Sequence, residues 1–199
     1  MTEDSQNQLA RDTVSSDQSN QEKPVRAAAN KRIRRILRNM LLSMLVTAAA
    51  VMLTVQFVFP IMRIYGSSMS STVIDGDIVI AHKTTALNRG DVCAFNYDGK
   101  ILCKRVIGVA DDVIDMDENG TVFLNGEVLD EPYLKGKNLG SCDVVFPVTV
   151  PENSYFVLGD NRRNSIDSRN MMIGCISEEQ VVGRLLFCIL PLPSFGAIK

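Results

Sequence analysis

The chain has 199 residues, of which 46% are apolar, and its formal net charge is −2. This length allows one well-packed core with a small appendage, and the nearly neutral charge argues against a dedicated nucleic-acid binder and against a wholly disordered chain. Because His82 is the only histidine and the five cysteines show no CxxC spacing, we expect no metal ion and no cofactor.

The first residues form a polar tail. Residues 1–30 are rich in Gln, Asn, Ser, Asp and Glu and lack periodic apolar residues, so they cannot offset the entropy lost on ordering. A basic cluster follows, made of Lys31, Arg32, Arg34, Arg35 and Arg38. We therefore predict a flexible tail over residues 1–38 that ends in this cluster.

An apolar segment comes next. Residues 40–62 carry no charged side chain, and as a helix they would rise about 34 Å, enough to cross a hydrocarbon core of about 30 Å. We predict a transmembrane helix over residues 39–62. The segment closes on Phe57-Val58-Phe59-Pro60, without a small-x-small cleavage site, which favours an uncleaved anchor. The basic cluster precedes the span, so the tail is expected in the cytoplasm and residues 63–199 on the extracellular side of the cell membrane.

Short apolar runs separated by turn signals predict a mostly β domain over residues 63–199. Three Asp-Gly or Asn-Gly pairs, at residues 98–99, 119–120 and 125–126, favour tight hairpins with positive φ. Residues 111–143 are predicted to be a small polar insertion, and the apolar residues 185–198 either a closing strand or a surface that dips into lipid headgroups. The expected strands are residues 78–82, 91–96, 101–109, 113–117, 121–124, 144–150, 155–158 and 181–189.

Two candidate reactive groups lie outside the membrane segment. Ser68 sits among small residues in the stretch 66–72, where its hydroxyl is accessible, although Ser-rich turns are usually only turns. Lys104 interrupts an apolar strand, where a lysine ordinarily sends its amine to water. To act as a base it must be neutral at pH 7, which costs about 4.6 kcal/mol from a pKa of about 10.4, and burial can supply such a shift. A two-residue turn at 98–99 would pair Lys104 with Cys93.

A polar cluster, residues 159–169, follows the expected strand 155–158. Its composition alone fits a solvated loop. However, Asp167 and Arg169 lie two residues apart in an extended segment, so they can point the same way, and loops after buried strands often carry functional groups.

Together these segments resemble the type I signal peptidases, and specifically the Gram-positive-style members, over about residues 31–198. The order and approximate spacing of four motifs carry the resemblance. They are Gly66-x-Ser68-Met69-x-x-Thr72, Gly76-Asp77, Lys104-Arg105-Val106-Ile107-Gly108 and Gly159-Asp160-Asn161-Arg162-x-x-Ser165-x-Asp167-Ser168-Arg169.

The resemblance implies a membrane-anchored serine endopeptidase with a Ser/Lys dyad. Ser68 would be the nucleophile, and its backbone N–H would contribute to the oxyanion hole. Lys104 would be the general base, and Ser165 would hydrogen-bond and orient it. Asp167 and Arg169 would form a supporting ion pair.

The implied substrates are exported preproteins whose signal peptides end in Ala-x-Ala. Met69 would help to line the pocket for the small side chain before the scissile bond, since an extended peptide presents alternate side chains to one wall. The chain departs from the family at Ser71, where proline is usual, and at Gly66, which lacks a hydroxyl that some relatives add to the oxyanion hole. The expected partners are signal peptides and membrane lipid, with no nucleic acid, and the protein is expected to be a monomer.

Three rival interpretations remain open. A non-catalytic signal-peptidase-like factor for pilin assembly would bind substrates without cutting them, but such relatives typically lack the dyad. A self-cleaving repressor-type protease also uses Ser and Lys, but it should carry a DNA-binding module and no membrane span. A Ser-His enzyme would depend on His82, and His82→Ala would then abolish turnover whereas Lys104→Ala would not.

Overall fold

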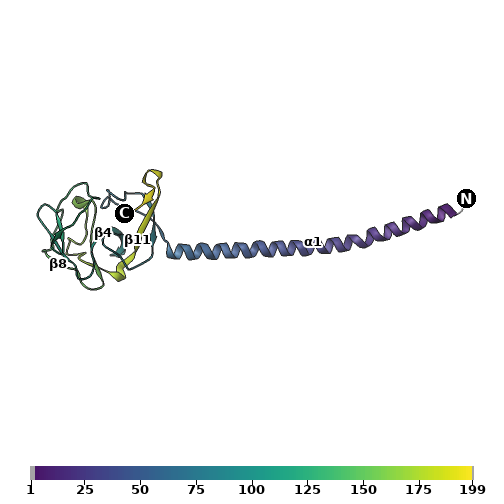
Figure 1. Ribbon diagram of the computed structural model, residues 1–199, viewed down its shortest axis with the longest axis horizontal. Helices are drawn as coiled ribbons and strands as arrows, with labels where there is room; N and C mark the ends of the chain where they lie inside the picture. The colour runs from purple at the N-terminus through teal and green to yellow at the C-terminus, as the bar shows by residue number, and fades with distance from the viewer. Residues whose placement is uncertain (1–2, 199) are drawn as a thin grey trace. The chain divides into compact units, whose positions relative to one another are not determined.

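The structure is a computed structural model that describes residues 3–198, with side chains from residue 31 onward. The chain divides into two units at about residue 54, an N-terminal helical unit and a unit that carries the strands. Figure 1 shows the helix α1 and the labelled strands β4, β8 and β11.

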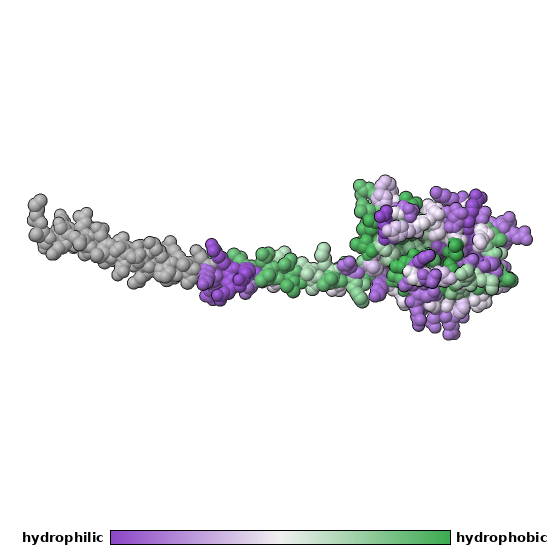
Figure 2. All heavy atoms as spheres, turned by 180° about the vertical axis from the view of Figure 1, so that it is seen from behind, coloured by the Kyte–Doolittle hydropathy of each residue, from purple (hydrophilic) through white to green (hydrophobic). Residues whose placement is uncertain are grey.

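The helix α1 spans Glu3–Val58, and its part over residues 31–58 is long and apolar enough to cross a membrane. Figure 2 shows the basic cluster in purple and the apolar stretch after it in green. The tail that we predicted over residues 1–38 belongs to this helix from Glu3 onward, and residues 1–2 lie outside the described residues. The helix ends four residues before the predicted end at residue 62, because Pro60 has no N–H to continue it.

The end of α1 leads directly into the larger of two sheets. The Lys83 N–H donates to the Val58 carbonyl oxygen at 2.9 Å, and the Ala81 N–H donates to the Pro60 carbonyl oxygen at 3.0 Å. This sheet has the order β1-β2-β11-β3-β4-β9-β10, and β12 also pairs with β11. Its strands are β1 (Ile61–Arg63), β2 (Ile78–His82), β3 (Val92–Tyr97), β4 (Lys100–Gly108), β9 (Ser154–Leu158), β10 (Ile176–Ser177), β11 (Val181–Leu190) and β12 (Gly196–Ala197).

The hairpin of β3 and β4 forms as predicted. Asp98 and Gly99 both have positive φ, 48° and 71°, as a two-residue turn of this type requires. The register pairs Cys93 with Lys104. This register sets the face of the sheet on which the Lys104 side chain lies.

Most of the predicted polar insertion folds into a second sheet, which a strand beyond residue 143 completes. The order of this sheet is β7-β6-β5-β8, from β5 (Val113–Met116), β6 (Val122–Leu124), β7 (Glu127–Val128) and β8 (Val148–Thr149). Its residue Ile114 packs with Ile107 of β4 and Phe156 of β9, so the two sheets share a core. The prediction of a strand over residues 144–150 was too long, because the Val144 N–H donates to the Arg169 carbonyl oxygen and Pro147 has no N–H to donate.

Other elements differ from the sequence expectations in detail. The strands β1, β7, β10 and β12 were not predicted. The Asn119-Gly120 pair does not form a turn with two positive φ angles, since only Gly120 has one, at 81°, and the Asp117 carboxylate instead accepts from the N–H groups of Asn119 and Thr121. Three short 3-10 helices complete the described chain, Arg162–Asn164, Glu178–Gln180 and Leu192–Ser194.

Candidate active site

A turn after β1 carries the proposed nucleophile, Ser68. The Ile64 N–H donates to the Asp77 carbonyl oxygen and the Gly76 N–H to the Ile64 carbonyl oxygen, which closes the loop on itself. Met69, next to Ser68, is only 2% exposed and packs in the core cluster with Val79 of β2. The turn is therefore fixed by Met69 below it, while the Ser68 side chain stays partly accessible.

Lys104 lies on β4 with its amine against the nucleophile. The side chain is 3% exposed, and Nζ lies 2.9 Å from Ser68 Oγ and 3.0 Å from the Cys103 carbonyl oxygen. Burial lowers the pKa of this amine, an effect that the nearby Asp167 charge partly opposes. A neutral amine at this distance can accept the hydroxyl proton of Ser68.

A cavity of about 490 Å³ extends from the dyad. It is lined by residues of the segments 62–66, 68–69 and 100–104, so β1 and the first half of β4 form its two sides. Met69 contributes to its wall, and most of the lining surface is apolar. The cavity can take an extended peptide with small apolar side chains.

The backbone N–H of Ser68 is available to donate a hydrogen bond, as far as the described residues show. Within residues 31–198 its N–H group donates to no oxygen, whereas its carbonyl oxygen accepts the Asn161 N–H at 2.9 Å. A free N–H on the nucleophile itself is the kind of donor that stabilises an oxyanion. Two of the buried side-chain oxygens that lack a hydrogen-bond partner in the described chain are on serines, Ser71 Oγ at the position of the family proline and Ser165 Oγ.

The polar cluster after β9 lies behind this turn. Asp167 and Arg169 form a buried bidentate ion pair, with Nε–Oδ1 and Nη2–Oδ2 distances of 2.8 Å each. Burial raises the pKa of Asp167, but the hydrogen bonds and charge of Arg169 outweigh it, so the net pKa is lowered. Asp167 also accepts the Gly159 N–H at 2.9 Å. The pair thus holds Gly159 in place.

Gly159 leaves no room for a side chain. A Cβ atom there would lie 2.6 Å from the Ser68 carbonyl oxygen and 2.2 Å from Ser165 Oγ. The backbone after β9 therefore packs directly against the nucleophile turn and against Ser165. The expected hydrogen bond from Ser165 to Lys104 is not formed, because the Lys104 amine lies against Ser68 and its own strand, and Ser165 Oγ faces Gly159.

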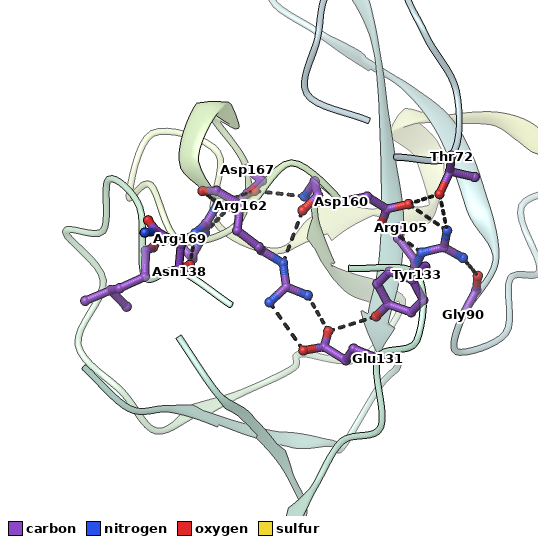
Figure 3. Close-up of polar contacts among 12 residues, drawn as sticks. Thr72, Gly90, Arg105, Glu131, Tyr133, Asn138, Asp160, Arg162, Asp167 and Arg169 are labelled. Atoms are coloured by element: carbon purple, nitrogen blue, oxygen red, sulfur yellow. Dashed lines mark hydrogen bonds and ion pairs between the residues drawn. The ribbon is translucent and has the colours of Figure 1, made fainter. Parts of the chain in front are cut away.

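Sequence reasoning gave no role to a second set of buried charges, drawn in Figure 3. Arg105 pairs with Asp160 at Nε–Oδ1 2.9 Å and Nη2–Oδ2 2.7 Å, and its guanidinium lies 4.0 Å over the Tyr133 ring. Thr72, from the nucleophile loop, donates its hydroxyl to Asp160. The sequence offered one signal for this set of charges, because Arg105 directly follows Lys104 in one of the motifs that carry the resemblance.

The insertion contributes the other part of this set. Glu131 accepts hydrogen bonds from the buried guanidinium of Arg162 and from the Tyr133 hydroxyl, the latter at 2.8 Å. Both Glu131 and Arg162 are almost completely buried. No local pattern marks Glu131 or Tyr133 as partners of the residue 159–169 cluster, because the contact forms only in the folded chain.

The remaining candidates lie elsewhere. His82, at the end of β2, packs on the Phe59 ring with centroids 5.5 Å apart and does not line the cavity of the dyad. All five cysteines are free thiols. Among the described residues, no group of His, Cys, Asp or Glu side chains is arranged to hold a metal ion.

Comparison with known proteins identifies the relatives of this chain. Residues 37–190 match the family model described as signal peptidase, peptidase S26. Signal peptidase I S of Bacillus subtilis is 37% identical over 68% of this chain and 79% of its own length, and signal peptidase I U of the same organism is 35% identical over 83% and 93%. A crystal structure of a signal peptidase I from Enterococcus faecalis, 33% identical, aligns with 50% of this chain and 97% of its own at a TM-score of 0.43.

Proposed function

The chain belongs to the signal peptidase family, peptidase S26, and is a type I signal peptidase that acts on the signal peptides of preproteins; from this premise we propose that it cuts by a Ser68/Lys104 dyad, after small-x-small sites. The observation that carries the proposal is the contact of 2.9 Å between Lys104 Nζ and Ser68 Oγ, made by an amine that is 3% exposed. A buried lysine whose pKa is lowered, next to an accessible hydroxyl, has the arrangement of a general base next to a nucleophile.

In the first half of the reaction, Ser68 Oγ attacks the carbonyl carbon of the scissile bond as Lys104 takes the hydroxyl proton. Negative charge develops on the carbonyl oxygen, where the Ser68 N–H stabilises it. Lys104 then gives the proton to the amine of the departing mature protein. The signal peptide remains as an ester on Ser68.

In the second half, Lys104 takes a proton from a water molecule, and the resulting hydroxide attacks the ester carbonyl. The C–O bond to Ser68 breaks and the signal peptide leaves with a free carboxylate. Because Lys104 returns the proton to Ser68 Oγ, the enzyme regains its starting state. The same amine serves as base and acid in both halves, as microscopic reversibility requires.

The supporting groups hold this geometry. The Asp167–Arg169 pair fixes Gly159, and Gly159 supports the Ser68 carbonyl from behind. The Arg105–Asp160 pair binds Thr72 from the nucleophile loop. Since Arg105 is the neighbour of Lys104 on β4, the base and the nucleophile loop are tied to the same strand.

The cavity beside the dyad bears on which substrates are selected, and α1 bears on where the protein is located. The cavity wall at Met69 admits small side chains, and an extended peptide between β1 and β4 would direct alternate side chains toward it. The apolar part of α1 anchors the protein by a single span. The positive-inside rule then places the basic cluster in the cytoplasm and the β-rich unit on the outer side.

The test is cleavage of a preprotein with an Ala-x-Ala site by the full-length protein in detergent. Wild type and the control His82→Ala should release the mature protein, whereas Ser68→Ala and Lys104→Ala should release none above background. Replacing either alanine of the site by a bulky residue should block cleavage. Intact substrate with wild type would instead indicate a non-cleaving assembly factor, and activity in Lys104→Ala would refute the dyad.

A further inference from the structure

A second cavity, of about 310 Å³, lies on the other side of the nucleophile turn. Ser70 lines it, together with residues 135–138 of the insertion and residues 160–163 of the polar cluster. It shares no lining residue with the cavity of the dyad, to which the same turn contributes Ser68 and Met69. The turn therefore separates the two cavities.

The second cavity is positively charged. Lys135, Lys137 and Arg163 line it, and all three side chains are exposed. None of them forms an ion pair within the part of the chain that the structure describes. The two other charged residues of the lining are already neutralised, Asp160 by Arg105 and Arg162 by Glu131 (Figure 3). Three uncompensated cations thus surround this space.

The position of this cavity along the substrate follows from the reaction. If the signal peptide occupies the apolar cavity up to Ser68, the residues after the scissile bond continue beyond that cavity, and Ser70, two residues further along the turn, lines the second one. Asn161 joins the wall of the second cavity to the nucleophile turn, since its N–H donates to the Ser68 carbonyl oxygen at 2.9 Å and its Nδ2 to the Ser67 carbonyl oxygen at 3.0 Å. The cations are therefore held close to the departing chain.

We propose that this cationic cavity is a specificity subsite that binds an acidic side chain among the first few residues of the mature protein. The inference rests on the proposed function and adds to it a preference on the leaving-group side of the bond. A carboxylate there would meet two lysine ammonium groups and one guanidinium, and an ammonium would be repelled by the same groups. A single exposed charge pair of this kind changes binding by roughly 1.4-fold to fivefold, and attraction of Glu together with repulsion of Lys combine in the ratio between the two.

The experiment compares peptides that carry Glu, Gln or Lys at the second, third or fourth residue after an Ala-x-Ala site. For at least one position, wild type should cleave the Glu peptide with a kcat/KM about threefold to tenfold above that of the Lys peptide, with Gln between them. The difference should lie mainly in KM and should shrink in high salt, because ions screen exposed charges.

Charge reversal gives the decisive variant. Lys135→Glu/Lys137→Glu should invert the preference, so that the Lys peptide becomes the better substrate while the Gln peptide is cleaved as before. The control Lys83→Gln removes one positive charge away from the cavity, because Lys83 lies over the Phe57 ring and is not among the residues that line the cavity. This control should keep the wild-type preference.

Each other outcome has a defined meaning. Equal cleavage of the Glu, Gln and Lys peptides by wild type would overturn the subsite and leave the proposed function intact. No cleavage of any peptide would overturn both. An alternative role for the cations is to bind the membrane, and this is tested with enzyme reconstituted in vesicles with and without anionic lipid. If the reversed variant loses activity equally on all three peptides, and does so only in vesicles that contain anionic lipid, the cations bind the membrane and the subsite is refuted.

Discussion

Replacing Gly159 by alanine tests whether the backbone after β9 positions the nucleophile. The added Cβ would lie 2.6 Å from the Ser68 carbonyl oxygen and 2.2 Å from Ser165 Oγ. Ordinary van der Waals contact begins near 3.4 Å, so the Ser68 backbone would have to retreat by roughly 0.8 Å. A shift of this size away from Lys104 would lengthen the distance from Ser68 Oγ to Lys104 Nζ, now 2.9 Å, beyond hydrogen-bond range.

We expect Gly159→Ala to lower kcat/KM about a hundredfold, which is the cost of misplacing a reacting group by about 1 Å. It should also lower the free energy of unfolding by about 1–3 kcal/mol, because the methyl group overpacks a filled region. The assay is preprotein cleavage at a temperature where thermal unfolding shows the variant to be folded.

The matched control is Gly196→Ala in β12. A Cβ at Gly196 would have no atom within 4 Å, and the φ of this residue needs no glycine. This variant should keep wild-type activity and stability. If folded Gly159→Ala cleaves as fast as Gly196→Ala, Gly159 does not hold Ser68 against Lys104 and the positioning argument is wrong.

Four further predictions concern the buried charges. Burial lowers the pKa of Lys104, so kcat/KM should rise with pH along a limb below the value of about 10.4 of an ordinary lysine, and a limb at or above it would contradict the buried base. Between the lowered pKa of Lys104 in the folded chain and its ordinary pKa in the unfolded chain, the unfolded chain binds more protons than the folded one. Wild type should therefore gain stability relative to Lys104→Met as pH rises through that window, as melting curves would show. Glu131→Gln leaves the buried Arg162 charge unpaired and should cost about 3–5 kcal/mol in denaturant unfolding, whereas a loss below about 1 kcal/mol would mean that water reaches the guanidinium. Burial raises the pKa of Asp167 but Arg169 lowers it on balance, so Asp167 stabilises the fold above its unfolded pKa of about 3.9, and this stabilisation disappears as pH falls toward its folded pKa. Acid unfolding of Asp167→Asn should therefore be less steep than that of wild type, and identical curves would refute this.

Local sequence rules predicted the elements that local physics decides. The hairpin of β3 and β4 is one, because Asp98-Gly99 tolerates the positive φ that its turn needs and the flanking strands alternate correctly. The end of α1 was predicted too late, although Pro60 was visible, because apolar composition continues past the proline. The strands β1, β7, β10 and β12 have only two or three residues each, too few for any periodic pattern.

The site was harder to predict because its parts meet only in the tertiary structure. Ser68 and Lys104 are 36 residues apart, and no periodic pattern links them, so the resemblance to a family supplied the pair. The contact of Glu131 with Arg162 joins the insertion to the polar cluster, and that of Tyr133 with Arg105 joins it to β4. The composition of these segments predicts neither contact. The missing bond from Ser165 to Lys104 depends on differences in side-chain direction that a motif does not record.

The register that begins at the two-residue turn between β3 and β4 determines which β4 side chains face Ser68. Neighbouring positions of β4 face opposite ways, and they carry an amine that can lose its proton and a guanidinium that cannot. Inserting or deleting one residue of β4 between this turn and Lys104, with the turn unchanged, would exchange them and aim Arg105 at the hydroxyl of Ser68. The length of this short strand segment therefore decides which of the two side chains reaches the nucleophile.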